Sequence, residues 1–420
     1  MMPKVLRGMG RFWLFDVGSA SFLGTGLLAL VMLLVMAVAE KYAAMPVMLG
    51  MIQVSTCAAI AWQLNRLSAT EWASLVPGYA DNIQWQALMV GGVASLISLT
   101  AALILPIEGA IAQVGVATLA GVVFVYVCRL HIKSFYFSFG LFLLLPFLPE
   151  ITAMLPSLSL WCLPVAIIGF IYLIRCDLQR VVWHLEARSV YLNGLEMGWF
   201  WLPNLGSNNL MMRLDRWLHP VNFFTGPMLS MLLVLLPSLA LVMSLVNVVA
   251  GIELPVLFIM GQFSAVACSL VHWSRIQRWR AAETLYILPG FDGKQGMVEA
   301  FARGQYRLLS YITLTMALLA SFAYWLSDSV TLIIWCHLVL STFSVCAILL
   351  GLGCASRNAM HISLSLLVVI CHAIWLSTAL LAAREGRDLT AWLAIDLGLV
   401  AFSLLTLWWG KQKLWRDHLV

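Results

Sequence analysis

Five polar side chains lie inside long apolar runs of the sequence, where chemistry would be shielded from water: Gln53, Gln113, His337, His372 and Asp396. Ionisable groups inside a membrane span mark ion pathways and proton relays by default. A structural interpretation stands beside this one. Asp396 lies about two turns from the end of its run, so its carboxylate can snorkel to the boundary or satisfy a helix contact. His337 and His372 can form a packed, neutral, hydrogen-bonded pair rather than a relay.

Other patterns that carry chemistry are missing from the sequence. It contains no G-x-x-x-x-G-K-[ST] phosphate loop, so the chain is not expected to bind ATP itself. Its 9 cysteines form no C-x-x-C pair, which argues against a zinc site or structural disulfides. The acids between the apolar runs are scattered, without paired-carboxylate spacing. We therefore expect no catalytic residue, no metal site and no cofactor in this chain.

The composition shows what surrounds these residues. Apolar residues make up 62% of the 420 and charged residues 10%, whereas soluble domains have about 45–50% and about 25%. So few charges cannot cover a water-soluble surface of this size. A soluble enzyme, a disordered chain and a nucleic-acid-binding module are therefore excluded, and the sequence predicts an all-α integral membrane protein.

Apolar runs of about 20 residues, long enough to span a bilayer, occur twelve times. The predicted spans are 18–39, 45–64, 86–107, 110–130, 134–153, 156–175, 220–249, 254–274, 305–326, 329–353, 359–383 and 390–410. Several contain proline, which a span tolerates when neighbouring helices satisfy the freed carbonyl groups.

Basic residues set the expected orientation. Of the 24 Lys and Arg, only Lys41, Arg384 and Arg387 fall on the side opposite the N-terminus. Cytoplasmic loops carry the excess of Lys and Arg, so both termini are predicted to be cytoplasmic.

The sequence also predicts two halves with an even number of spans each. The expected parts are residues 1–175, a first six-span half with an N-terminal interfacial helix; 176–219, a cytoplasmic amphipathic linker with a second interfacial helix; and 220–420, a second six-span half. Apolar residues at one helical spacing mark the interfacial helices: Val5, Met9, Phe12 and Trp13, and Leu210, Leu214, Trp217 and Leu218. Halves with even span numbers are parallel repeats.

Each half carries the same motif after its second predicted span: an Arg, a Glu five positions later, then five residues, Pro-Gly and an aromatic residue. We call residues 66–79 the first elbow and residues 278–291 the second elbow. Their matched residues are Arg66, Glu71, Pro77, Gly78 and Tyr79, and Arg278, Glu283, Pro289, Gly290 and Phe291. Pro-Gly ends helices. The motif therefore predicts a short, rigid helix outside the membrane that is suited to pass force from a partner into the neighbouring spans.

This layout resembles the membrane subunits of ABC-type exporters of the polysaccharide and drug-export (type V) class. In that family each six-span unit begins with an interfacial helix, and a coupling helix with a Glu and a later Pro follows span two; Glu71 to Pro77 and Glu283 to Pro289 match those positions. The family also bends the chain between spans five and six, as Pro146, Pro149, Glu150 and Pro156 suggest for the first half. The second half lacks these prolines, and two units are fused in one chain, which are two departures.

The resemblance implies a permease in a bacterial cytoplasmic (inner) membrane that exports an unidentified small molecule, lipid or peptide. A separate ABC ATPase subunit would bind ATP and dock on the elbows. Two alternatives stay open. One is an ion- or proton-coupled secondary transporter, for which Asp396, His337, His372, Gln53 and Gln113 are the candidates. The other is a membrane enzyme acting on lipid-linked substrates, which would need clustered acids or histidines at one membrane face.

Overall fold

The computed structural model describes residues 8–14, 16–38, 40, 42, 45–107, 109–177, 183–197, 209–250, 255–287, 290–326 and 330–415. All regular structure in these ranges is helical. Eleven of the described helices are long and apolar enough to cross a membrane. The expected all-α integral membrane protein is therefore confirmed.

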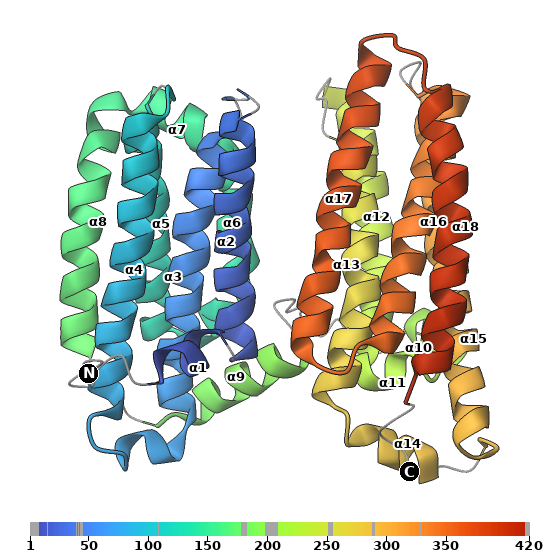
Figure 1. The fold of residues 1–420 in the computed structure, drawn as a ribbon, viewed down its shortest axis with the longest axis horizontal. Helices are drawn as coiled ribbons and strands as arrows, with labels where there is room; N and C mark the ends of the chain where they lie inside the picture. Colours follow the sequence, from blue (N-terminus) through green and yellow to red (C-terminus); the bar gives the residue numbers. More distant parts are fainter. Residues whose placement is uncertain are drawn as a thin grey trace. The chain divides into compact units, whose positions relative to one another are not determined.

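The chain divides into two compact units, residues 1–201 and 202–420 (Figure 1). The division falls inside the predicted linker 176–219. The described parts of that linker belong to different units: α9 (Leu185–Met197) packs on unit 1, and α10 (Asn209–Leu218) packs on unit 2.

Unit 1 is built around one buried helix, α3. Besides α9, the elements of unit 1 are α1 (Met9–Leu14), α2 (Val17–Val38), α3 (Met45–Ala69), η3 (Glu71–Ser74), α4 (Tyr79–Ile104), α5 (Ala110–Leu130), η4 (Ile132–Phe137), α6 (Ser138–Leu143), η5 (Leu145–Phe147), α7 (Leu148–Met154) and α8 (Pro156–Asp177). Small residues such as Ala58, Ala59 and Ala61 are fully buried on α3. Small side chains let helix backbones approach closely inside a membrane, and α3 accordingly packs against α2, α4, α5 and α9.

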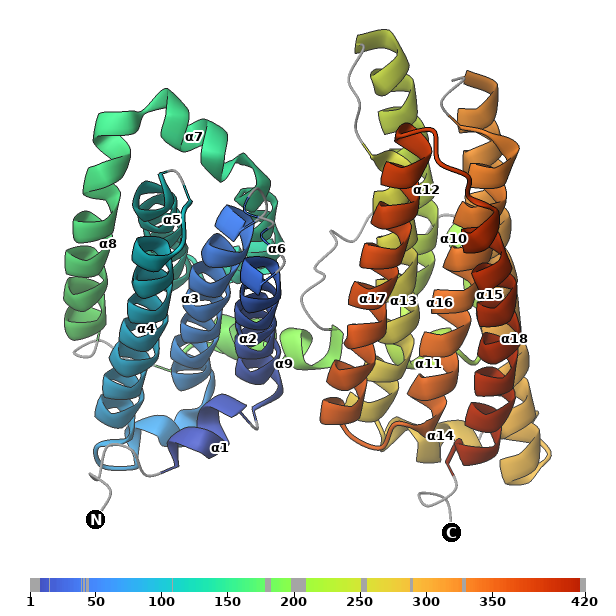
Figure 2. The ribbon, with the colours of Figure 1, turned by 45° about the horizontal axis from the view of Figure 1, so that its top comes forward.

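The predicted span 134–153 is wrong as a single helix. The chain there forms η4, α6, η5 and α7 in succession, and α7 arches from α6 towards α8 (Figure 2). Pro146 lies in η5 and Pro149 in α7. Proline has no N–H to donate and its ring clashes with the preceding turn, so two prolines three residues apart break the run instead of merely kinking it.

Within the described residues, unit 2 contains six long helices and two short ones besides α10. They are α11 (Asn222–Thr225), α12 (Pro227–Ala250), α13 (Val256–Gln277), α14 (Ala281–Ile287), α15 (Gly293–Leu326), α16 (Leu332–Ala355), α17 (Ala359–Arg384) and α18 (Thr390–Lys413). The α16–α18 pair crosses at Gly351 and Gly410, where a Cβ on Gly410 would lie 2.2 Å from the Gly351 carbonyl oxygen. The two backbones therefore touch, which only glycine permits at this crossing.

Two helices begin earlier than hydropathy predicts. α4 begins at Tyr79 rather than near 86, and α15 begins at Gly293 rather than near 305. The added turns of α15 carry Glu299 and Arg303. Backbone hydrogen bonds continue a helix through polar residues as easily as through apolar ones, whereas hydropathy detects only the apolar part.

Candidate functional site

The first elbow contains the short helix that its motif predicts. After α3 ends at Ala69, η3 holds Glu71, and Gly78 has φ 69° in front of α4. Such a φ is favourable only for glycine, which explains the residue type at the turn. Glu71 is exposed and lies 3.4 Å from Arg188 of α9, so this elbow also contacts the helix that follows α8.

Arg66, the first residue of the first elbow, forms an ion pair with the segment just before α2. Its guanidinium lies 3.1 Å from a carboxylate oxygen of Asp16, and the Asp16 side chain is only 7% exposed. Trp62 donates its indole N–H to the other oxygen of Asp16 at 2.5 Å. Ser19, in the first turn of α2, donates both its backbone N–H and its hydroxyl to the same oxygen. Asp16 therefore joins the start of α2 to the end of α3.

Aromatic rings form a second attachment in unit 1. Tyr79, the residue after Pro77-Gly78, packs on Phe12 of α1 with ring centroids 5.4 Å apart. Arg66 also lies over the Phe12 ring at 5.4 Å, within the range of a cation–π interaction. On the other side, Tyr191 of α9 approaches Asp16; burial, followed by the Asp16 charge, raises the pKa of Tyr191 to about 12.

The second elbow repeats this construction with different residues. α14 holds the exposed Glu283 and buries Ala282 and Leu285 against the unit. Gly290 has φ 122°, another conformation suited to glycine. Pro289 lies outside the described residues.

Arg278 and Phe291 make the matching attachments in unit 2. Arg278 donates to the backbone carbonyl of Phe224 at 3.0 Å, in α11, just before α12. Phe291, the residue after Pro-Gly, stacks on His219 with centroids 6.2 Å apart. Partial burial lowers the pKa of His219, which favours the neutral ring in this stack.

An acid also bonds to the first turn of the first long helix in both units. Asp215 of α10 accepts a short hydrogen bond from the hydroxyl of Ser230 in α12, and another from Asn222 at 3.0 Å. Asp16 and Ser19 make the corresponding pair in unit 1. The sequence reasoning missed both acids. One pattern could have identified them: each short apolar stretch before a first long helix contains one acid.

Gln53 is a structural side chain. Its amide donates to the Ala94 carbonyl at 3.0 Å and to Ser98 at 2.8 Å, and its oxygen accepts from Thr118 at 3.2 Å. These bonds join α3 to α4 and α5. Gln113 is likewise buried, on α5.

The Asp396 side chain does not extend to the surface of unit 2, contrary to one expectation from the sequence. It is fully buried and forms a short hydrogen bond with Nδ1 of His337 in α16. Trp375 of α17 donates its indole N–H to the other carboxylate oxygen at 2.9 Å. His372 lies in α17 with its Nδ1 3.1 Å from the Gln262 amide of α13. We call these five residues the acid–histidine cluster; Trp375 and Gln262 were not identified from the sequence.

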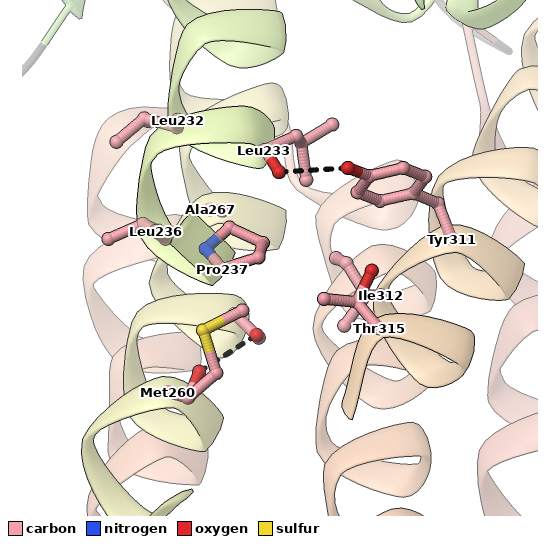
Figure 3. A pocket seen from close by; sticks show the side chains of 10 residues that line it. Leu232, Leu233, Leu236, Pro237, Met260, Ala267, Tyr311, Ile312 and Thr315 are labelled. Atoms are coloured by element: carbon pink, nitrogen blue, oxygen red, sulfur yellow. Dashed lines mark hydrogen bonds between the residues drawn. The ribbon is translucent and has the colours of Figure 1, made fainter. Parts of the chain in front are cut away.

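A small cavity in unit 2 lies between α12, α13 and α15 (Figure 3). Its volume of about 10 Å³ corresponds to roughly one water molecule. Pro237 borders it and, lacking an N–H, leaves the carbonyl of Leu233 without its helical partner. The Tyr311 hydroxyl donates to that carbonyl at 2.9 Å. The neighbouring helix thus satisfies the freed group, as membrane helices require.

Within the ranges that the structure describes, no group of three or more His, Cys, Asp or Glu is placed to hold a metal ion. No protein-family model, no curated protein and no solved structure matches the chain.

Proposed function

We propose that this chain is the membrane permease of an ATP-driven exporter of the ABC type, with ATP bound by a separate cytoplasmic subunit. The observation that carries the proposal is the repeated attachment of the elbows. In each unit an arginine and an aromatic residue of the elbow hold the segment before the first long helix: Arg66 and Tyr79 in unit 1, Arg278 and Phe291 in unit 2.

This attachment supports mechanical coupling. A force on η3 acts directly on α3 and α4, and through the Arg66–Asp16 ion pair it also acts on α2. In unit 2 a force on α14 acts on α13, and through Arg278 on the start of α12. Each elbow also presents an acid and apolar side chains to a partner: Glu71 with Leu75 and Val76, and Glu283 with Tyr286 and Ile287.

The packing order supports the proposed internal repeat of two six-helix halves. In unit 1, α3 packs on α2, α4 and α5, and α5 packs on α8. In unit 2, α13 packs on α12, α15 and α16, and α16 packs on α18. When the long helices of the two units are matched in chain order, corresponding helices pack against corresponding partners. The proposed permease consists of two such parallel halves in a bacterial inner membrane, with both termini and both elbows on its cytoplasmic side.

The test is the double variant Glu71→Ala with Glu283→Ala. We expect it to abolish ATP-dependent efflux from reconstituted vesicles while expression and monodispersity stay normal. Arg188→Ala is the control, because it removes the ion pair of Glu71 but leaves both elbow acids in place. Full transport by the double variant, or equal loss in the control, contradicts coupling through these acids.

One observation favours a second candidate, an ion-coupled secondary transporter: the fully buried Asp396–His337 pair. Ionisable groups at such positions serve ion pathways in that class. Solute uptake by the purified chain alone under a proton or sodium gradient would support this candidate, whereas a requirement for ATP and a second subunit would support the exporter.

A further inference from the structure

Each oxygen of the Asp396 carboxylate has a hydrogen-bond partner. Trp375 can only donate through its indole N–H, so the oxygen that it contacts at 2.9 Å is an acceptor. The other oxygen meets Nδ1 of His337. The short contact between Asp396 and His337 places one proton between the carboxylate oxygen and Nδ1.

Three buried polar atoms around this pair have no hydrogen-bond partner among the described residues: Nε2 of His337, Nε2 of His372 and the hydroxyl of Thr342. All three side chains are at most 6% exposed. Gly261 adjoins two of these side chains, since a Cβ there would lie 3.4 Å from the Thr342 hydroxyl and 3.6 Å from the His372 ring. Buried polar groups normally find a partner, so unsatisfied imidazole nitrogens point to a ligand as small as a proton or a water that carries one.

The Gln262 amide is placed to respond to the charge of His372. With a neutral ring, Nδ1 of His372 can accept from the amide nitrogen at 3.1 Å. With both ring nitrogens protonated, Nδ1–H must donate instead, and the acceptor at hand is the Gln262 carbonyl oxygen, which is buried and unpartnered. Protonation therefore requires Gln262 to turn its amide over.

Few other charges bear on the cluster. α12 contains no ionisable residue, and the charged residues of α13, α15 and α18 lie near the opposite ends of those helices: Arg275, Lys294, Glu299, Arg303, Arg307, Lys411 and Lys413. The outer half of α15 offers only the tyrosines 311 and 324, and α16 and α17 offer Cys336 and Cys371 beside the histidines. Arg384, Glu385, Arg387 and Asp388 lie beyond, at the end of α17 and in the turn before α18.

We propose that Asp396, His337 and His372 form an intramembrane proton-binding site. The Asp396–His337 pair holds one proton, and a second binds a neutral imidazole. That proton comes from hydronium, leaves water behind and creates an imidazolium, with no change in electron count. Protonation is passed on as a rotation of the Gln262 amide on α13, the helix that ends at the second elbow. Only this coupling to the elbow rests on the proposed function.

The experiment follows nitrogen-15-labelled histidine signals of the full-length protein in lipid nanodiscs as the pH is changed. His337→Gln and His372→Gln assign the two rings among the 8 histidines. In the wild type we expect both rings to titrate together. Asp396→Asn keeps an acceptor for Trp375 but removes the charge, and we expect it to shift the titration midpoints of both rings. Unchanged midpoints would overturn the proposal.

Matched controls lie on the same elements. Asp388→Asn changes an exposed acid before α18, and His361→Gln changes an exposed histidine of α17; neither should shift the midpoints of His337 or His372. If Asp396→Asn does not fold, His372→Gln decides, because it leaves the Asp396–His337 pair intact and must still shift the His337 signal. No ATP or transport is measured, so failure here is distinct from failure of the exporter proposal.

Discussion

At the residue scale, side chains in this protein supply the hydrogen bonds that a bilayer cannot. Tyr311 satisfies the carbonyl that Pro237 leaves free, and Gln53 is saturated by bonds to two neighbouring helices. The sequence singled out Gln53, and it showed that several spans contain proline, but it did not identify their partners. Partners come from other helices, 41 to 78 residues away in these cases, and a local pattern carries no information on such pairings.

Tyr311→Phe should destabilise unit 2, because it leaves the Leu233 carbonyl without a donor. We expect a loss of about 1 kcal/mol, between the usual value for interhelical bonds in membranes and the cost of a buried unsatisfied group. The loss should shrink in a Pro237→Ala background, where residue 237 regains an N–H for that carbonyl. Unfolding in mixed micelles measures both, and an equal loss in the two backgrounds would refute the pairing.

The stack of His219 on Phe291 should weaken in mild acid. Burial lowers the pKa of His219 in the folded protein, so the unfolded chain binds the proton more readily. The contribution of the neutral ring is therefore fully present above the ordinary histidine range, declines as the pH falls below that range and is lost once the pH has fallen through the lowered pKa of the folded protein. We expect the second elbow to become more accessible to protease below that range, and His219→Phe to abolish the pH dependence. A pH dependence that survives this substitution would assign it to another group.

At the element scale, close helix crossings and broken helices define the units. Each predicted span overlaps one long helix except 134–153, where hydropathy could not distinguish a span from a bent chain of short helices; the starts of α4, α12 and α15 differ from those predicted. Prolines 146 and 149 were visible in the sequence, but one proline in a span is tolerated, as Pro164 in α8 and Pro237 in α12 show. The spacing of the prolines, not their presence, decides the outcome.

Gly410→Ala should separate α16 from α18. Its methyl group would overlap the backbone of Gly351, which cannot move aside as a flexible side chain would. Overpacking of this kind costs about 1–3 kcal/mol, against a gain in helix propensity of up to about 1 kcal/mol. Gly398→Ala on the same helix meets nothing within 4 Å and should be neutral or stabilising. If the two variants unfold alike, the crossing is not as tight as described.

At the scale of the whole molecule, the two elbows are the feature that sequence and structure share, because each contains a short helix followed by a glycine with positive φ. The sequence identified Arg66, Gly78, Arg278 and Gly290 through their matched spacing. It could not identify Asp16, Phe224 or His219, because these contacts depend on how the short helices α1, α10 and α11 fold back on each unit. The two elbows match in sequence where the backbone demands glycine, and they differ where other residues make comparable contacts.

The proposed orientation places the turn before α18 outside the cell and the second elbow inside. Single cysteines at Gly386→Cys and Asp292→Cys, in a background without the 9 native cysteines, test this in intact cells. We expect an impermeant maleimide to label residue 386 but not residue 292. Reversed labelling would invert the proposed topology and remove the elbows from the reach of a cytoplasmic ATPase.

The most direct test of the central claim is purification of the tagged chain from its native membranes in mild detergent, followed by quantitative mass spectrometry of the proteins that accompany it. We predict a stoichiometric partner that carries a phosphate-binding loop, and its loss when Glu71 and Glu283 are both changed to alanine but not when Arg188 is. A chain that purifies without any such ATPase, and still moves solute under an ion gradient, would contradict the account.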